Sequence, residues 1–258
     1  MSTSQTQPQV TSVSAGRIDA KDRLIVALDL ASVDEARRLV DSLDGAATFY
    51  KVGLVMQLAE GVEDFICSLI REGKKVFLDY KYYDIGETLK KAVASASRLG
   101  VSFLTIHGPS TLIKAAVEGR GDSGLKLLAV TVLTSLDAGD MAEMGYTHAV
   151  DELVLFRARK ALEAGCDGVI ASGQEAAKIK SVCGGKFLVV TPGIRPAGAS
   201  AGDQKRITTP GDAIRDGADY LVVGRPITAP DRGTPREAAE AIAAEMQAAF
   251  DARSAETS

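Results

Sequence analysis

The sequence predicts an α/β fold, a single eight-stranded (β/α)8 barrel of the TIM-barrel architecture. Eight short runs rich in Val, Ile and Leu recur along the chain. Most segments between them carry apolar residues at three- and four-residue spacing, which is typical of helices. No linker or low-complexity stretch divides the middle of the chain, and 258 residues suit a fold that typically needs about 250. An open doubly wound sheet is the alternative.

The expected strands are apolar on both faces, as in a parallel sheet covered by helices. They are Leu24–Leu28, Phe49–Val52, Lys75–Asp79, Phe103–Ile106, Leu127–Leu133, Gly168–Ala171, Phe187–Thr191 and Tyr220–Val223. Helices are expected at Val33–Leu43, Met56–Arg71, Thr88–Leu99, Ser110–Glu118, Val150–Ala164, Glu175–Val182, Pro210–Arg215 and Pro235–Phe250. Four glycines mark helix ends just before a strand, namely Gly73, Gly100, Gly165 and Gly217. The elements therefore alternate as a barrel requires.

Both ends of the chain are expected to lie outside the barrel. Residues 1–20 are rich in Ser, Thr and Gln and contain no apolar core of signal-peptide length, which indicates a disordered tail. Residues 251–258 are expected to form a second loose tail. The barrel domain is therefore expected to cover residues 21–250.

Composition argues against several classes of partner. Hydrophobic residues make up 46% of the chain and charged residues 25%, as in an ordinary globular protein. The net charge of −4 does not favour a nucleic-acid-binding or membrane-surface role. The three cysteines, Cys67, Cys166 and Cys183, are odd in number and lack metal or redox spacing. We interpret them as packing residues, and unpaired thiols suit the reducing cytoplasm.

Polar residues gather where the first three strands are expected to end. Asp29 closes the first strand, Lys51 lies near the end of the second, Asp79 and Lys81 close the third, and Asp84 follows. Active sites of such barrels lie at this C-terminal face. On an extended segment, Asp79 and Lys81 point to the same side because they are two residues apart. Each Asp alone could be a helix cap or turn residue, but the group together indicates a charged site.

The loops after the last two strands suggest a phosphate site. Gly193 and Arg195 follow the seventh strand, and Gly224 and Arg225 follow the eighth. In such barrels these loops commonly bind phosphate through backbone N–H groups, and glycine allows close approach. Arginine adds a planar set of donors that matches phosphate oxygens. A phosphorylated small molecule is therefore the expected ligand.

The densest motif begins at the end of the third strand, Asp79-Tyr80-Lys81-Tyr82-Tyr83-Asp84-Ile85-Gly86-Glu87-Thr88. Its D-x-K-x-x-D-I-x-x-T pattern resembles the signature of the orotidine 5′-phosphate decarboxylase family. Further matching segments follow in order between about Arg23 and Asp231. They are LIVALDL ending near Asp29, YKVG around Lys51, AVTVLTS around Thr134, SGQEA from Ser172, VTPGIRP from Val190, Asp203-Gln204-Lys205-Arg206 and VVGRPIT from Val222.

The resemblance implies a reaction and its catalytic residues. The expected activity is conversion of orotidine 5′-phosphate to uridine 5′-phosphate and CO2, a carbon–carbon lyase step of pyrimidine biosynthesis. It would need neither metal nor cofactor. Lys81 would donate the proton, and Asp79, Asp84 and Lys51 would complete the charged network around it.

The resemblance also implies the substrate contacts. Asp29 and Lys51 would contact the ribose, and Thr134 or Ser135 would contact the pyrimidine, with both hydroxyls left as candidates. The residues that bind the phosphate would be Gln204, Gly224 and Arg225, with Arg195 close by. Asp84 and Thr88 would reach into the site of a second subunit, so a homodimer is expected.

Two positions depart from the family pattern. The family usually has Pro at the position of Gly86 and often His at the position of Tyr83. Gly86 would loosen the backbone after Asp84, because Pro would have fixed φ. Neither position carries the proton, so the effect is expected on loop mobility or dimer packing.

Two alternatives remain. Hexulose-phosphate synthases and ketogulonate-phosphate decarboxylases share the D-x-K-x-x-D core but use magnesium, with an extra carboxylate near the second strand. This chain has Lys51 there, followed by Gly53. The second alternative is a non-catalytic barrel that binds a nucleoside monophosphate.

Overall fold

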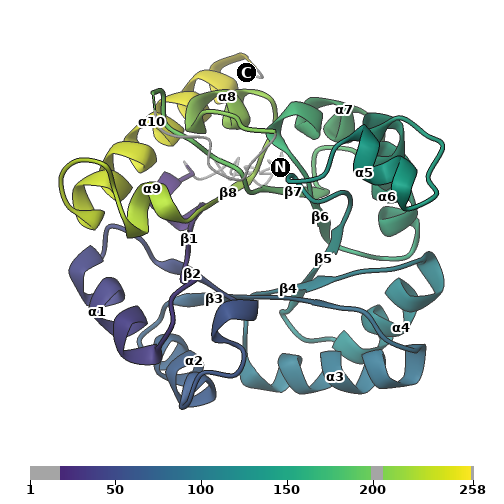
Figure 1. Cartoon of the computed structure of the whole chain (residues 1–258), viewed down its shortest axis with the longest axis horizontal. Coiled ribbons are helices and arrows are strands. Elements are labelled where there is room, and N and C mark those ends of the chain that lie inside the picture. Colours follow the sequence, from purple (N-terminus) through teal and green to yellow (C-terminus); the bar gives the residue numbers. More distant parts are fainter. Residues whose placement is uncertain (1–17, 199–205, 257–258) are drawn as a thin grey trace, which may run out of the picture.

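A computed structural model describes residues 18–198 and 206–256, and its strands form a closed parallel barrel (Figure 1). Each strand pairs with the next in sequence, and β1 closes the barrel against β8. The strands are β1 Leu24–Ala27, β2 Phe49–Gly53, β3 Lys75–Tyr82, β4 Phe103–Ile106, β5 Lys126–Val130, β6 Gly168–Ile170, β7 Leu188–Thr191 and β8 Tyr220–Val223. The predicted (β/α)8 barrel is confirmed, and the open sheet is wrong.

Helices surround the strands in a ring (Figure 1). The α-helices are α1 Val33–Leu43, α2 Val62–Arg71, α3 Gly86–Leu99, α4 Ser110–Arg120, α5 Ala138–Glu143, α6 Val150–Glu163, α7 Gly173–Cys183, α8 Pro210–Arg215, α9 Arg225–Thr228 and α10 Pro235–Glu256. Two 3-10 helices are η1 Ala20–Asp22 and η2 Leu54–Met56. Within the described ranges, no helix has the length and apolar character needed to cross a membrane.

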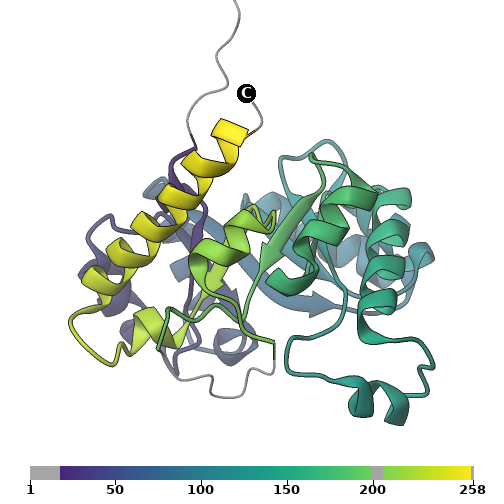
Figure 2. The ribbon, with the colours of Figure 1, turned by 90° about the horizontal axis from the view of Figure 1, so that it is seen from above.

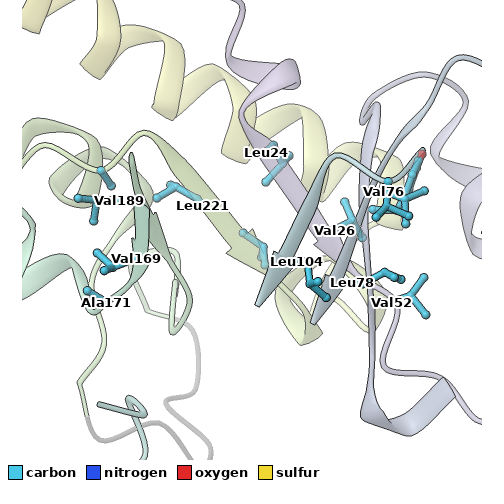
Figure 3. Packing of buried hydrophobic residues seen from close by; sticks show 14 of the residues in the cluster. Leu24, Val26, Val52, Val76, Leu78, Leu104, Val169, Ala171, Val189 and Leu221 are labelled. Carbon is cyan, nitrogen blue, oxygen red and sulfur yellow. The ribbon is translucent and has the colours of Figure 1, made fainter. Parts of the chain in front are cut away.

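Side chains alternate along each strand between two apolar layers. Leu24 and Val26 of β1 face the helices, whereas Ile25 and Ala27 face the barrel interior. Figure 3 shows part of the outer layer, with labelled side chains from most of the strands. Burial of each Val or Leu side chain contributes about 1.5–3 kcal/mol, so this layer holds the ring of helices against the sheet.

Aromatic rings fill the barrel interior at the N-terminal ends of the strands. Phe49, Phe103 and Tyr220 are the first residues of β2, β4 and β8. The ring centroids of Phe49 and Phe103 lie 4.9 Å apart, and those of Phe103 and Tyr220 lie 5.0 Å apart. Tilted and edge-on pairs of this kind add to the stabilisation from burial alone. The interior is therefore filled at the N-terminal ends of the strands, and polar residues have room at the opposite end.

Two expected boundaries at the chain ends are wrong. Helix α10 continues to Glu256, so residues 251–256 do not form the expected loose tail. Arg253 anchors the last turns, because its Nη1 donates to the carbonyls of Ile214 (2.9 Å) and Ala218 (3.2 Å). At the other end Ala20 is buried, and its backbone N–H donates to Oε1 of Gln247 at 2.9 Å. The rest of the expected N-terminal tail, residues 1–17, lies outside the described residues.

The segment after β5 also differs from expectation. The strand ends at Val130, and residues 131–133 lead instead into α5, a helix that was not predicted. Its start is a capping box in which the side chains of Asp137 and Asp140 each accept a backbone N–H of the other residue. In the perpendicular view α5 and its loops extend from one end of the barrel (Figure 2). This segment forms one wall of the cavity described below.

Candidate functional site

A cavity of about 480 Å³ opens at the C-terminal ends of the strands. It is both polar and apolar, with charged side chains from β1 to β3 on one side and the loops after β5, β7 and β8 on the other. The lining residues are Ala27, Asp29, Lys51, Phe77, Asp79, Lys81, Val132, Leu133, Thr134, Ser135, Ile170, Pro192, Gly193, Arg195, Val222, Gly224, Arg225 and Thr228. Size and composition suit a small polar molecule.

Two lysines and two aspartates form a continuous charged network in this cavity. Lys51 Nζ lies 2.9 Å from Asp29 Oδ1 and 3.5 Å from Asp79 Oδ2. Lys81 Nζ lies 2.9 Å from Asp79 Oδ1, so Asp79 joins the two lysines. The Lys51 side chain is 9% exposed and Asp79 is 16% exposed, whereas Lys81 is 30% exposed. The network is therefore buried at its centre, and Lys81 keeps access to the cavity.

The charge of Asp79 depends on its neighbours. Burial by itself raises the pKa of this carboxyl group, because a buried charge loses hydration. The ammonium groups of Lys51 and Lys81 outweigh burial, with hydrogen bonds from Lys81 and Thr105 adding to their effect. The result is an Asp79 pKa below its usual value. Asp79 therefore remains a carboxylate between the two ammonium groups.

Thr105 is a member of this network that the sequence analysis missed. It is fully buried on β4, and its hydroxyl donates to Asp79 Oδ1 at 3.0 Å. Thr105 Oγ1 in turn accepts the backbone N–H of Lys81 at 2.9 Å. A hydroxyl can donate and accept at once, so Thr105 joins the backbone of Lys81 to the carboxylate of Asp79. The available signal was a lone polar residue inside an otherwise apolar strand.

The backbone at Lys81 is not extended, contrary to the expectation for this segment. Lys81 has φ of 49°, in the left-handed region that non-glycine residues rarely adopt. The pairing of β3 with β4 is irregular over the same stretch, between Leu78 and Tyr82. Such strain costs on the order of 1–3 kcal/mol and persists where surrounding contacts hold it. The side chains of Asp79 and Lys81 still meet as expected, but across an irregular stretch of β3 rather than an extended one.

Gly53 packs tightly against the network. A Cβ atom at this position would lie 2.9 Å from Lys51 Nζ and 3.0 Å from Asp29 Oδ1. Both distances are shorter than ordinary van der Waals contacts, so the ends of the Lys51 and Asp29 side chains would have to shift to admit a side chain at this position. The glycine after Lys51 therefore leaves room for the charged pair.

The loops expected to bind phosphate do line the same cavity. Gly193 has φ of 77°, a conformation that favours glycine, and turns the chain after β7. Arg195 is buried, and its Nη1 donates to the carbonyl of Ile194 at 2.8 Å. Gly224 and Arg225 meet the cavity where β8 passes into α9. Gln204, expected to contact phosphate, lies outside the described residues.

The expected base contacts lie along the wall formed by the loop after β5. Thr134 and Ser135 both line the cavity, and Thr134 is buried. Their hydroxyls can donate or accept a hydrogen bond, as recognition of a pyrimidine edge requires. The cavity therefore combines a charged network, two candidate hydroxyls and a pair of arginine-bearing loops.

Two of the predicted site residues are not brought to the cavity within one chain. Among the described residues of a single chain, neither Asp84 nor Thr88 lines it, and both are exposed. Asp84 Oδ1 instead accepts the backbone N–H of Ile85 at 2.7 Å. Gly86, the departure from the family pattern, is the first residue of α3. A Cβ there would lie 3.5 Å from Cβ of Ala115, an ordinary contact, so local packing does not require glycine.

Comparisons with known proteins show which family this chain resembles. The profile of the Orotidine 5′-phosphate decarboxylase / HUMPS family matches residues 22–242. A protein of Nitrobacter winogradskyi named orotidine 5′-phosphate decarboxylase is 55% identical over 227 residues, which cover 88% of this chain and 93% of that protein. A protein of the same name from Methylorubrum extorquens is 53% identical over 229 residues, covering 89% and 97%.

A solved structure supports the same assignment. The crystal structure of orotidine 5′-phosphate decarboxylase from Lactobacillus acidophilus superposes with a TM-score of 0.76 at 38% identity. The match covers 87% of this chain and 99% of that structure. Sequence and fold therefore agree along nearly the whole length of these relatives.

Proposed function

The chain belongs to the Orotidine 5′-phosphate decarboxylase / HUMPS family, and on that premise we propose that it converts orotidine 5′-phosphate to uridine 5′-phosphate and CO2. The observation that carries this proposal is the Asp29–Lys51–Asp79–Lys81 network, which lies in one cavity with the Gly224-Arg225 loop. The reaction belongs to pyrimidine biosynthesis and breaks a carbon–carbon bond. The test is loss of the substrate's ultraviolet absorbance on mixing with the purified protein.

In the proposed complex the substrate extends across the cavity. The phosphate lies against Gly224 and Arg225, with Arg195 and Gln204 nearby. The ribose hydroxyls meet Asp29 and Lys51, and the pyrimidine lies against Thr134 and Ser135. This orientation places carbon 6 of the ring next to Lys81. It is supported by the positions of the described residues around the cavity.

The proposed chemistry is a proton transfer coupled to loss of CO2. The bond between carbon 6 and the carboxylate breaks, and its electron pair remains on carbon 6. The Lys81 ammonium then donates a proton to that carbon, and the resulting amine regains a proton from water. A developing carbanion is stabilised most by a cation already fixed in place, which is the role of the Lys81–Asp79 contact.

Repulsion between Asp79 and the substrate carboxylate is the smaller contribution. Two unit charges about 4 Å apart at an effective dielectric constant of about 20 interact by roughly 4 kcal/mol. Complete relief of that repulsion would accelerate the reaction about a thousandfold. Stabilisation of the carbanion by Lys81 is realised in the transition state and is therefore expected to contribute more.

We propose that no metal takes part. The carboxylates that line the cavity, Asp29 and Asp79, each already bond a lysine ammonium at 2.9 Å. A metal-dependent member of the family would need such carboxylates free as ligands. Full activity after treatment with a chelator is the expected result. Loss of activity that Mg²⁺ restores would instead favour the hexulose-phosphate synthase or ketogulonate-phosphate decarboxylase type of reaction.

We further propose a homodimer in which Asp84 and Thr88 complete the partner's site. Support comes from exposed apolar side chains in the segments that follow β2 and β3. Leu58 is 95% exposed, Ile85 is 72% exposed and Tyr83 is 66% exposed. Mixing chains that carry Lys81→Ala with chains that carry Asp84→Ala should restore activity that neither has alone. Without restoration, Asp84 would belong to the site of its own chain.

The proposed setting is the cytoplasm, with a small-molecule substrate and neither nucleic acid nor membrane as partner. The three cysteines are unpaired in the structure, as expected for a reducing compartment. Burial raises the pKa of the Cys166 thiol to about 12, so this thiol is held in its unreactive form. Cys166 is therefore assigned to packing.

A further inference from the structure

We infer that Glu175 and Arg206 are positioning residues that hold the backbone presenting Thr134 and Ser135 to the pyrimidine. The inference rests on the proposed function, and it concerns residues to which that reaction assigns no step. Arg206 Nη1 lies 2.5 Å from Glu175 Oε1. Its Nη2 donates to the carbonyls of Val132 and Leu133, both at 3.0 Å.

The Glu175–Arg206 pair is buried, unlike most ion pairs between the described residues. The Glu175 side chain is 7% exposed and that of Arg206 is 12% exposed. Burying two charges is costly, and the cost is offset only where geometry is good and further hydrogen bonds are made. Here the two carbonyls supply part of those bonds, whereas Glu175 Oε2 and Arg206 Nε have no hydrogen-bond partner among the described residues, and burial raises the pKa of Glu175. The pair therefore depends on the loop after β5 being in place, and the loop depends on the pair.

The carbonyls that Arg206 holds are beyond the reach of the sheet. Strand β5 ends at Val130, and the last contact with the sheet is the Thr131 N–H, which donates to the carbonyl of Ile170 at 3.2 Å, so the ladder does not extend to Val132 and Leu133. A second arginine, Arg157 of α6, donates to the carbonyl of Thr131 and, at 2.7 Å, to Tyr146 Oη. Two guanidinium groups thus hold three successive carbonyls, 131 to 133. The next two residues are Thr134 and Ser135, which line the cavity.

Glu175 and Arg206 together form a clamp on the loop after β5, and the segments that carry these two residues are themselves held in place. Glu175 lies in the first turn of α7, which is capped by Ser172 through a hydrogen bond to the N–H of Gln174. The segment after Arg206 pairs with the loop after β7 through a bridge between Ile194 and Thr208. Gly173 lets α7 pack closely on Thr208, since a Cβ there would lie 2.9 Å from Thr208 Oγ1. Arg206 therefore starts from a defined position.

A loop held in this way presents its hydroxyls without having to order on binding. Ordering a loop costs free energy of association, and small displacements of contact groups slow reactions strongly. The clamp should therefore affect the part of the ligand that meets Thr134 and Ser135, which is the base. It should not affect the phosphate and ribose. Comparing ligands with and without a base tests this directly.

The experiment measures dissociation constants of uridine 5′-phosphate and ribose 5-phosphate by calorimetry, together with kcat and KM. Arg206→Ala should weaken uridine 5′-phosphate binding by about 10- to 100-fold and change ribose 5-phosphate binding by less than about twofold. Arg206→Lys and Glu175→Gln should shift the same ratio in the same direction by smaller factors. The matched control is Lys178→Gln, also on α7, which breaks the exposed ion pair with Asp151 and should change neither ligand.

Two results would overturn the inference. Equal weakening of the binding of both ligands would mean that the clamp positions the groups that bind phosphate. Unchanged binding of both would mean that the Glu175–Arg206 ion pair does not position the site. If Arg206→Ala does not fold, Arg206→Lys and Glu175→Gln decide the question. A wild-type chain that binds uridine 5′-phosphate without decarboxylating the substrate would refute the proposed function. The comparison of uridine 5′-phosphate with ribose 5-phosphate would still test the role of Glu175 and Arg206.

Discussion

Replacing Thr105 with valine should disconnect the backbone of Lys81 from the carboxylate of Asp79 while keeping the shape of the side chain. The hydroxyl makes two bonds that valine cannot, one from Lys81 N–H at 2.9 Å and one to Asp79 Oδ1 at 3.0 Å. A donor left without a partner costs about 1–3 kcal/mol, and a hydrogen bond to a charged group contributes about 1.5–3 kcal/mol. The effects overlap, so we expect a loss of about 2–4 kcal/mol in the free energy of unfolding.

The catalytic effect should accompany the loss of stability. Without Thr105 Oγ1, the strained backbone at Lys81 loses a contact that holds it, and Asp79 loses a bond that lowers its pKa. Lys81 would then be less well aimed, and we expect kcat to fall by about 10- to 100-fold. Denaturant unfolding and the absorbance assay measure the two effects. Thr105→Ser is the matched control, because serine keeps the hydroxyl.

If the valine and serine variants behave alike, the Thr105 hydroxyl does not connect Lys81 to Asp79. Equal free energies of unfolding would mean that the hydroxyl is not needed to satisfy the Lys81 N–H. Equal kcat values would mean that the bond to Asp79 does not contribute to the position of Lys81. Either result would assign Thr105 to packing of β4 alone.

Four further substitutions test three residues that line the cavity and Gly53, which packs against the charged network. Lys81→Ala should abolish turnover but leave the circular dichroism spectrum unchanged; near-normal turnover would remove Lys81 as proton donor. Arg225→Ala should mainly raise KM, and an unchanged KM would exclude its phosphate contact. Lys51→Met should destabilise the protein most above about pH 4 and least in acid, measured by unfolding at a series of pH values. The reason is that Lys51 helps hold the Asp79 pKa below its ordinary 3.8, a stabilisation lost as pH falls through the folded-state value; a pH-independent difference would contradict it. Gly53→Ala should lower kcat/KM by separating Lys51 from Asp29, and wild-type kinetics would show that the pair tolerates a methyl group.

Elements with strong local signals could be predicted from the sequence, and those that depend on distant partners could not. The apolar runs located every strand, and the ranges of Phe103–Ile106 and Tyr220–Val223 were predicted to the residue. Helix α5 was missed because it is short and rests on one capping box. The end of α10 was missed because its last turns are held by contacts of Arg253 with α8 and the loop after it.

In the candidate site, too, the features with local sequence signals could be predicted, and those that depend on distant residues could not. Asp29, Lys51, Asp79 and Lys81 could be placed together because parallel strands bring their C-terminal ends to one face of a barrel. Their exact relation could not, because it depends on φ at Lys81 and on a hydroxyl from β4. Periodicity predicts which face a residue takes, and it carries no information on a bulge.

The buried Glu175–Arg206 pair was the feature furthest from the reach of sequence reasoning, because 31 residues separate its members. Each belongs to a motif that could be read as a local feature, SGQEA and Asp203-Gln204-Lys205-Arg206. Folding places the carboxylate on α7 and the guanidinium against two carbonyls that follow β5. A barrel of this kind thus fixes reactive groups by strand ends and fixes the loops around them by long-range pairs. Substitutions in the first class should remove the proposed chemistry, whereas substitutions in the second should weaken binding of the base while leaving Lys81 in place.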